Sequence, residues 1–181
     1  GVRWRVDAAL AASAVTILVV DAQTGLHPMD EEVACMIRRA GIEAFVAVNK
    51  CDLPLHERML PDFAALGFPL YPVSALHNRG VAELMRNVVT RLPATADASR
   101  GNALRVAVVG RPNAGKSSYI NRLLREPRVI VSDVAGPTRD SIEVPFSIGA
   151  GAKVRHYRLI DTAGMRNVHR MATAVDRFSL L

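Results

Sequence analysis

The sequence predicts an α/β fold in which helices cover both faces of a mostly parallel sheet. Apolar runs of strand length alternate along the 181 residues with segments whose apolar residues recur at helical spacing, and the links between them are short. Two of the runs, Val15–Val20 and Ala44–Val48, are continuously apolar, as in strands that a parallel sheet buries on both faces. A third run, Leu104–Val109, leads through a glycine-containing loop directly into a helical pattern.

The first 92 residues are predicted to supply three strands and four helical segments. Asp30 stands where it can cap the second helix, and Gly41 stands where it can end it. Pro54 lies near the start of the third helix and Gly67 follows its end. The expected strands are Val15–Val20, Ala44–Val48 and Leu70–Val73, and the expected helical segments are Val6–Ala14, Glu31–Ala40, Leu55–Leu66 and Val81–Leu92.

Residues 93–102 are small and polar and predict a linker, which divides the chain into residues 1–92 and residues 103–181. The second part is predicted to supply three more strands and two helices. Val129–Val131 is a short apolar patch to which no strand is assigned, and Ser132–Asp140 is expected to be a loop. The expected strands are Leu104–Val109, Ser141–Ile148 and Tyr157–Ile160, and the expected helices are Ser118–Leu124 and Val168–Leu181.

The stretch Gly110–Ser118 fits the phosphate-loop pattern G-x-x-x-x-G-K-[ST] at every fixed position. A strand, a tight loop and a helix start present backbone N–H groups to phosphate. Lys116 can reach the β- and γ-phosphates of a nucleotide, and the Ser117 hydroxyl can bind Mg²⁺. An ordinary glycine turn is the alternative. The predicted phosphate-binding residues are Asn113, Ala114, Gly115, Lys116, Ser117 and Ser118.

A second motif, Asn49-Lys50-Cys51-Asp52, follows the strand Ala44–Val48 at the edge where open α/β sheets bind ligands. The Asp52 carboxylate can accept from both N1–H and the exocyclic amine of guanine, which adenine cannot offer. Lys50 can lie along the base and pack against the phosphate loop. Ser74-Ala75 fits a loop that donates a backbone N–H to guanine O6. Taken alone, the four-residue motif could also be a strand end with an N-cap aspartate.

A third motif, Asp161-Thr162-Ala163-Gly164, fits a second phosphate-sensing loop. Asp161 is expected to hold Mg²⁺ through water, and the Gly164 N–H to bond the γ-phosphate until hydrolysis. Thr138, between the two phosphate motifs, is the candidate second hydroxyl on Mg²⁺. The candidate catalytic residues are therefore Lys116, Thr138 and Gly164. Met165 follows Gly164 where many GTPases carry a water-orienting glutamine.

These motifs predict a P-loop NTPase of the Ras-like G-domain type. Their order is circularly permuted, because guanine recognition precedes phosphate recognition along the chain. A complete G domain has six strands, and the two parts together supply one full set. We therefore expect the Leu104 strand to pair with the Val15 strand, and Asp52 and Lys116 to face one nucleotide-sized cleft. The pairing can form within one chain or by exchange of halves in a dimer.

The composition limits the remaining function classes. Twenty-three basic and seventeen acidic residues give a net charge of +6, and two of the three lysines, Lys50 and Lys116, stand in nucleotide motifs. The arginine-rich remainder suits a phosphate-rich partner such as RNA, but a solvated basic face explains it as well. Cys35 and Cys51 lack metal-ligand spacing, and their scarcity suits a reducing compartment. The longest apolar run, Ala14–Val20, is too short to span a bilayer, and no signal peptide is recognisable.

The motifs resemble those of the Der (EngA) family of ribosome-assembly GTPases, which carry two G domains in tandem. Residues 1–92 resemble the second half of a first G domain, and residues 103–181 the first half of a second. The resemblance implies GTP binding and hydrolysis to GDP, Mg²⁺, cytoplasmic action on the large ribosomal subunit or its RNA, and a hydrophobic residue at Met165. It also implies a K⁺ ion held partly by Asn113, as in related GTPases. A chain that begins at Gly1 could be a fragment, so a non-catalytic nucleotide-binding piece and a circularly permuted ribosome-assembly GTPase remain alternatives.

Overall fold

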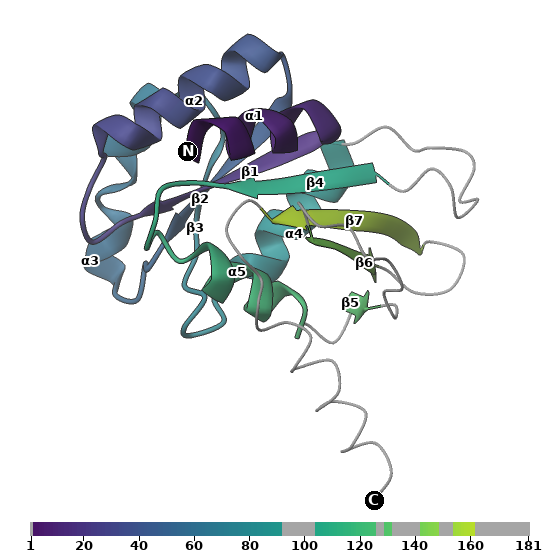
Figure 1. Cartoon of the computed structure of the whole chain (residues 1–181). Coiled ribbons are helices and arrows are strands. Elements are labelled where there is room, and N and C mark those ends of the chain that lie inside the picture. The colour runs from purple at the N-terminus through teal and green to yellow at the C-terminus, as the bar shows by residue number, and fades with distance from the viewer. Residues whose placement is uncertain (1, 92–103, 126–128, 132–141, 149–153, 162–181) are drawn as a thin grey trace, which may run out of the picture.

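A seven-stranded sheet in the order β3-β2-β1-β4-β7-β6-β5 forms the centre of the molecule (Figure 1). The computed structural model describes residues 2–91, 104–125, 129–131, 142–148 and 154–161. The elements are α1 Val2–Ala12, β1 Val15–Asp21, α2 Pro28–Ala40, β2 Glu43–Asn49, α3 Pro54–Glu57, the 3-10 helix η1 Leu60–Leu66, β3 Leu70–Pro72, α4 Val81–Arg91, β4 Leu104–Val109, α5 Lys116–Leu123, β5 Val129–Val131, β6 Ile142–Ile148 and β7 Arg155–Asp161.

The two parts of the chain meet between β1 and β4. These strands are parallel, with Val15 opposite Val106 and Leu18 opposite Val109. The other edge of β4 pairs in parallel with β7, and the other edge of β1 pairs in parallel with β2. The predicted pairing of the Leu104 strand with the Val15 strand is therefore confirmed within one chain, and it covers the apolar strand edge that each part would otherwise expose.

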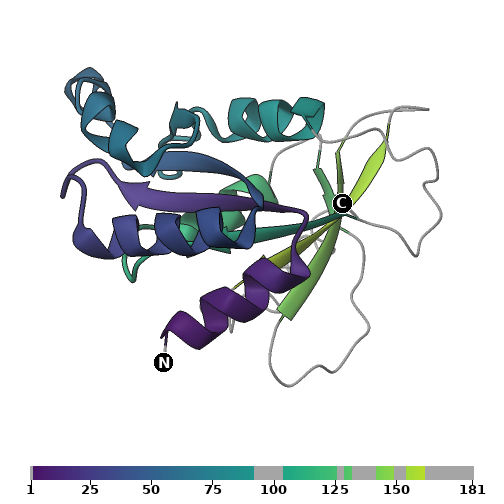
Figure 2. The same ribbon diagram turned by 90° about the horizontal axis from the view of Figure 1, so that it is seen from above.

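Helices cover both faces of the sheet, as predicted (Figure 2). Alternate residues of each strand point to opposite faces, so apolar strands place a hydrophobic core on each face for helices to cover. In β1, Ile17 and Val19 belong to the core beneath α4 and α5, whereas Leu18 and Val20 belong to the core beneath α1, α2 and η1. The central strands are buried on both sides, which explains their continuous apolar sequence.

Two expectations for the first part of the chain are wrong in detail. The helix expected over Leu55–Leu66 is interrupted: α3 ends at Glu57 and a separate 3-10 helix, η1, runs from Leu60 to Leu66. Pro61 is the cause, because proline donates no N–H and its ring clashes with the carbonyl four residues earlier.

The second expectation is that α2 starts at Glu31 with Asp30 as its N-cap. The helix begins three residues earlier at Pro28, and His27 is the N-cap. Asp30 lies inside the first turn, where its carboxylate accepts a hydrogen bond from the His27 N–H at 3.1 Å. The preference of proline for the first turn accounts for the difference.

The expectation of six strands is also incomplete, since Val129–Val131 forms a seventh strand, β5. It pairs antiparallel with β6, which pairs antiparallel with β7. A three-residue edge strand has too little pattern to distinguish it from an apolar patch. The linker at 93–102, the loop Ser132–Asp140 and the helix Val168–Leu181 lie outside the described residues. Among the residues described, no helix is long and apolar enough to cross a membrane.

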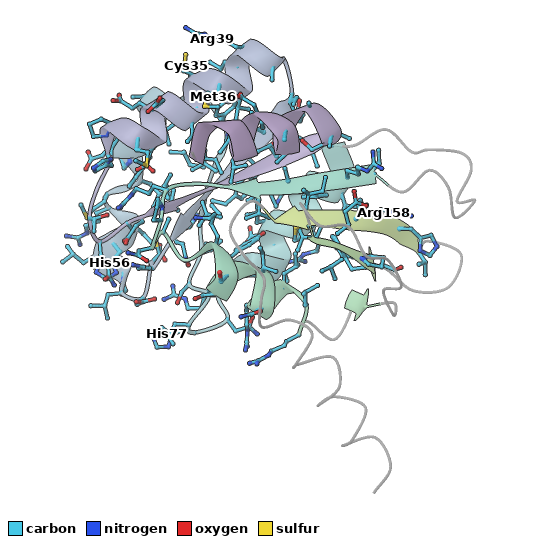
Figure 3. All side chains as sticks on the ribbon, in the orientation of Figure 1. Cys35, Met36, Arg39, His56, His77 and Arg158 are labelled. Atoms are coloured by element: carbon cyan, nitrogen blue, oxygen red, sulfur yellow. The ribbon has the colours of Figure 1, made fainter. Side chains whose placement is uncertain are left out.

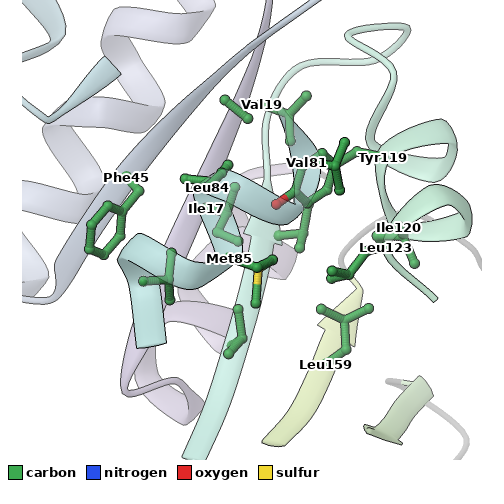
Figure 4. Close-up of a cluster of buried hydrophobic side chains, with 14 of the residues drawn as sticks. Ile17, Val19, Phe45, Val81, Leu84, Met85, Tyr119, Ile120, Leu123 and Leu159 are labelled. Carbon is green, nitrogen blue, oxygen red and sulfur yellow. The ribbon is translucent and has the colours of Figure 1, made fainter. Parts of the chain in front are cut away.

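Tyr119 on α5 is fully buried in the aliphatic core, in one cluster with Val81 and Leu84 (Figure 4). Among the described residues its hydroxyl has no hydrogen-bond partner, and burial raises the pKa of Tyr119 well above its usual range, so the group stays neutral. An unsatisfied buried hydroxyl costs about 1–2 kcal/mol. We therefore expect Tyr119→Phe to raise the free energy of unfolding by about this amount in urea denaturation. Tyr71→Phe is the control, because Tyr71 is only partly buried, and an equal gain there would contradict the explanation.

Candidate functional site

The predicted motifs gather at the edge of the sheet where the parallel strands β1, β2, β4 and β7 end. Asp21 at the end of β1 is opposite Asn49 at the end of β2, and Leu18 of β1 is opposite Val109, the last residue of β4. Val108 of β4 is in turn opposite Asp161 at the end of β7. The motif after β2 and the phosphate loop after β4 therefore flank the end of β1, at the usual ligand-binding edge of an α/β sheet.

Two glycines let the phosphate loop approach its neighbours closely. Gly110 has φ +145°, and a Cβ there would lie 2.2 Å from the Val19 carbonyl oxygen. Gly115 has φ +93°, and a Cβ there would lie 2.1 Å from the Asn49 Nδ2. Asn113 also adopts a positive φ, +63°. The loop can therefore lie against both β1 and the motif after β2 only because these two positions lack a side chain.

Lys116 begins α5 and is buried despite its charge. Its ammonium donates to the carbonyl oxygens of Gly110 at 2.9 Å and Arg111 at 2.7 Å, which both belong to the phosphate loop. The hydrogen bonds compensate the ammonium for its lost water. Gly115, the N-cap of α5, makes no side-chain cap, and Ser117 and Ser118 are exposed at the start of the helix. The Lys116 ammonium and the backbone N–H groups at the start of α5 are together the kind of donors that bind phosphate.

Asn49 joins the two motifs. Its Nδ2 donates to the Ala114 carbonyl oxygen of the phosphate loop at 3.1 Å. Its Oδ1 accepts from the Ala75 N–H at 3.2 Å. The side chain is 2% exposed, so both hydrogen bonds are protected from water. Asn49 therefore ties the phosphate loop, the motif after β2 and the Ser74-Ala75 loop into one unit.

Asp52 is held by a donor on each carboxylate oxygen. The Ser74 hydroxyl donates to Oδ1 at 2.6 Å, and the Gln23 side-chain amide donates to Oδ2 at 3.1 Å. Ser74 is fully buried, and its hydroxyl also accepts from the His77 N–H at 3.1 Å. Each carboxylate oxygen has a second lone pair, so two further donors on one ligand edge can still bind.

Lys50 is paired with Asp21. Its ammonium lies 2.6 Å from the Asp21 Oδ2, and its backbone has φ +65°. The other oxygen of Asp21 accepts from the Gln23 N–H at 2.9 Å. The structure therefore places the Lys50 ammonium on the buried carboxylate at the end of β1, and its expected packing along a base and against the phosphate loop stays a prediction. Between these motif residues, burial raises the pKa of Cys51 to about 11, so its thiol stays protonated.

Four residues of this region were not singled out as site residues. Asp21 ends β1 and holds Lys50, and Gln23, two residues later, holds Asp52. Arg111 of the phosphate loop lies 3.5 Å from the buried carboxylate of Asp30. An aspartate at the carboxyl end of a buried strand was a signal for Asp21. The remaining three have no local pattern, because their partners lie far away in the sequence.

Thr138, Gly164 and Met165 lie outside the described residues, and of Asp161 the structure gives the backbone position beside β4. Within the described residues, no group of three His, Cys, Asp or Glu side chains could hold a metal ion. Figure 3 labels His56 and His77, of which His77 is exposed and His56 is half-buried. A Mg²⁺ site with few protein ligands remains compatible with this, since Mg²⁺ usually keeps water and substrate phosphate oxygens.

Comparison with known proteins identifies GTP-binding domains in both parts of the chain. The model of the elongation factor Tu GTP binding domain matches residues 4–94, half of the chain. The model of the 50S ribosome-binding GTPase matches residues 105–180. The two matches flank the segment predicted to be a linker.

The chain is also similar over nearly its whole length to proteins named GTPase Der. It is 43% identical to that of Thermoanaerobacter pseudethanolicus, covering 99% of this chain and 40% of that protein. It is 43% identical to that of Syntrophotalea carbinolica with the same coverages. The chain therefore spans about two fifths of the length of these curated relatives. Among solved structures, YjeQ from Thermotoga maritima matches with a TM-score of 0.48 and 18% identity, over 66% of this chain and 43% of that one.

Proposed function

Because the chain belongs to the family of GTP-binding domains, whose elongation factor Tu model matches half of it, we propose that it binds guanine nucleotides with Mg²⁺ and hydrolyses GTP to GDP and phosphate. The observation that carries the proposal is the pair of buried hydrogen bonds of Asn49. Its side chain bonds the phosphate loop at Ala114 and the Ser74-Ala75 loop at Ala75. The base-reading and phosphate-binding residues are thereby held at fixed distance from each other, as one nucleotide requires.

In this proposal each part of the site has a separate task. Asp52 reads the guanine edge with an orientation set by Ser74 and Gln23. The Lys116 ammonium exchanges its carbonyl partners for the β- and γ-phosphates. Ser117, Thr138 and Asp161 would hold Mg²⁺, which neutralises charge on the phosphate oxygens. The Gly164 N–H would bond the γ-phosphate as water attacks in line.

Met165 cannot orient the attacking water as a glutamine does. We therefore expect a slow intrinsic rate, on the order of 10⁻⁴ per second. The test is to measure GDP affinity and phosphate release on the same sample of the 181-residue chain, with Lys116→Ala as the comparison. Binding and release above buffer, both lost in Lys116→Ala, support a GTPase. Tight GDP binding without release, even in K⁺, supports the alternative of a non-catalytic piece.

We propose that a K⁺ ion, with Asn113 as one ligand, supplies positive charge at the phosphates. It would compensate for the glutamine that Met165 replaces. Asn113 is exposed on the phosphate loop in a left-handed conformation. We expect faster phosphate release in KCl than in NaCl at equal ionic strength. Asn113→Gly, which keeps the positive φ and removes the side-chain ligand, should make the rates equal. Equal rates in the two salts for the unmodified chain would remove Asn113 from the ion site.

We further propose that the chain acts in the cytoplasm on the large ribosomal subunit or its RNA, with its half domains arranged as one permuted G domain. The match of residues 105–180 to a 50S ribosome-binding GTPase and the net charge of +6 support this partner. Cosedimentation with 50S subunits in a non-hydrolysable GTP analogue, compared with GDP, is the measurement. The same low binding in both nucleotide states would exclude a GTP-dependent contact of this chain.

A further inference from the structure

Arg111, the second residue of the phosphate loop, extends its side chain toward the other part of the chain. Its Nε lies 3.5 Å from the Asp30 Oδ1, and its Nη2 donates to the Thr24 hydroxyl. The Arg111 side chain is 15% exposed and that of Asp30 is fully buried. The contact therefore joins the phosphate loop to the segment between β1 and α2 under little screening by water.

Asp30 is a rigid anchor for this contact. Its Oδ2 accepts from the His27 N–H in the capping box of α2, while its Oδ1, which has no hydrogen-bond partner in the part of the chain that the structure describes, lies near Arg111. The helix in turn packs on the sheet through Val33 and Ile37. The carboxylate thus cannot move without moving the first turn of α2.

The main chain of Arg111 helps to hold Lys116 in the phosphate loop. Its carbonyl oxygen accepts from the Lys116 ammonium at 2.7 Å, next to the second acceptor on Gly110. Any shift of Arg111 therefore changes where Lys116 is held. The contact of its side chain with Asp30 and Thr24 restricts such a shift.

The charge of Asp30 is not needed to fold α2. Burial raises the pKa of Asp30, although the hydrogen bond from His27 and the charge of Arg111 lower it in part. Ionising this carboxyl in the folded chain therefore costs free energy. An asparagine accepts the same N-cap hydrogen bond through its side-chain oxygen without that cost.

We propose that Arg111 is a positioning residue of the phosphate loop, anchored across the two parts of the chain on Asp30 and Thr24, and that this anchor sets the affinity for nucleotide phosphates. The inference rests on the proposed function, because it concerns the same nucleotide. It gives a role to a position that the phosphate-loop pattern leaves unspecified, and it couples the β1–α2 segment to the phosphate loop.

The test compares Asp30→Asn with the unmodified chain in GDP affinity and thermal unfolding. We expect the affinity to fall about tenfold, the effect of losing one charge-assisted contact. The unfolding temperature should stay the same or rise. The ratio of GDP to IDP affinity should not change, because Asp52 still reads the base. Asp62→Asn, an exposed carboxylate on η1, is the matched control and should bind GDP normally.

Arg111→Met is the second variant, since it removes the charge and keeps an apolar stem. It should lose a similar factor, and the double variant should lose little more than either single one, because both changes break one contact. Unchanged GDP affinity in Asp30→Asn, additive losses in the double variant, or a loss that parallels a fall in unfolding temperature would each overturn the anchor. If the unmodified chain fails to bind GDP, the proposed function fails and the anchor falls with it; if it binds and Lys116→Ala does not, the anchor is judged alone.

Discussion

Asp52→Asn is expected to reverse the base preference of the chain from guanine to xanthine. The substitution replaces one carboxylate oxygen by an NH₂ group, which then faces the exocyclic amine of guanine, donor against donor. Xanthine carries an oxygen at that position and can accept. A site that hydrogen-bonds a polar group discriminates against the analogue lacking it by about 10⁴-fold, so the GDP:XDP affinity ratio should change by this order.

The surroundings of Asp52 allow this change without loss of the fold. The remaining side-chain oxygen can still accept from the Ser74 hydroxyl, which lies 2.6 Å from the Asp52 Oδ1 in the unmodified chain. The Gln23 amide, which donates to Oδ2 at 3.1 Å, can rotate to present its oxygen to the new NH₂ group. Unfolding temperature should therefore change little.

Competition binding with GDP and XDP measures the ratio, and Asp62→Asn removes the same charge from η1 as a control. An Asp52→Asn chain that keeps its preference for GDP would show that another group reads the base. A chain that loses both nucleotides and unfolds at a lower temperature would instead assign Asp52 a structural role.

Gly115→Ala is expected to abolish nucleotide binding and to destabilise the fold. The new Cβ would lie 2.1 Å from the Asn49 Nδ2, so either the phosphate loop or Asn49 must move. Movement of Asn49 breaks its buried hydrogen bonds to Ala114 and Ala75. Left-handed strain and two unsatisfied buried groups together cost about 3–5 kcal/mol. GDP affinity should fall at least about a hundredfold.

Gly41→Ala separates the steric effect from backbone strain. Gly41 caps α2 with φ +67°, and a Cβ there would meet nothing within 4 Å. Only the left-handed strain should appear, about 1–2 kcal/mol, with GDP affinity unchanged. Urea denaturation and GDP titration of both variants provide the comparison. Equal destabilisation by the two substitutions would mean that the close approach of Gly115 to Asn49 is not important.

The pairing of β1 with β4 has a consequence for any shorter piece of this chain. The strands β3, β2, β1, β4 and β7 pair in parallel, and the junction between residues 1–92 and 103–181 runs between β1 and β4 near the middle of the sheet. Either part alone would expose an apolar edge and lose half of a shared core. We therefore expect the described residues on either side of this junction to unfold together, although the chain spans only about two fifths of the relatives named GTPase Der.

Local patterns in the sequence determined the motifs and most of the helices and strands, though not the short strand β5. Continuous apolar runs predicted β1 and β2, because strands buried on both faces need apolar residues at nearly every position, and a run interrupted only by Arg105 predicted β4. Glycine at 41 predicted the end of α2 because the cap requires a positive φ. Pro61 also carried a local signal, and the break between α3 and η1 follows from it. The two-part motif order was equally visible, since each motif lies within a few residues.

Only the tertiary structure decided which side chains the motif residues touch. Asn49 meets Ala114 from 65 positions away, Gln23 meets Asp52 from 29 positions away, and Asp30 meets Arg111 across the two parts of the chain. No spacing along the sequence encodes these distances. They arise because the parallel pairing of β1 with β2 and β4 brings three strand ends to one edge. Polar groups buried there lose their water and are destabilising unless they find hydrogen-bond partners in the protein. Lys50 shows the effect most clearly: its ammonium binds the buried carboxylate of Asp21, 29 positions away in the sequence, while its packing along a base stays a prediction.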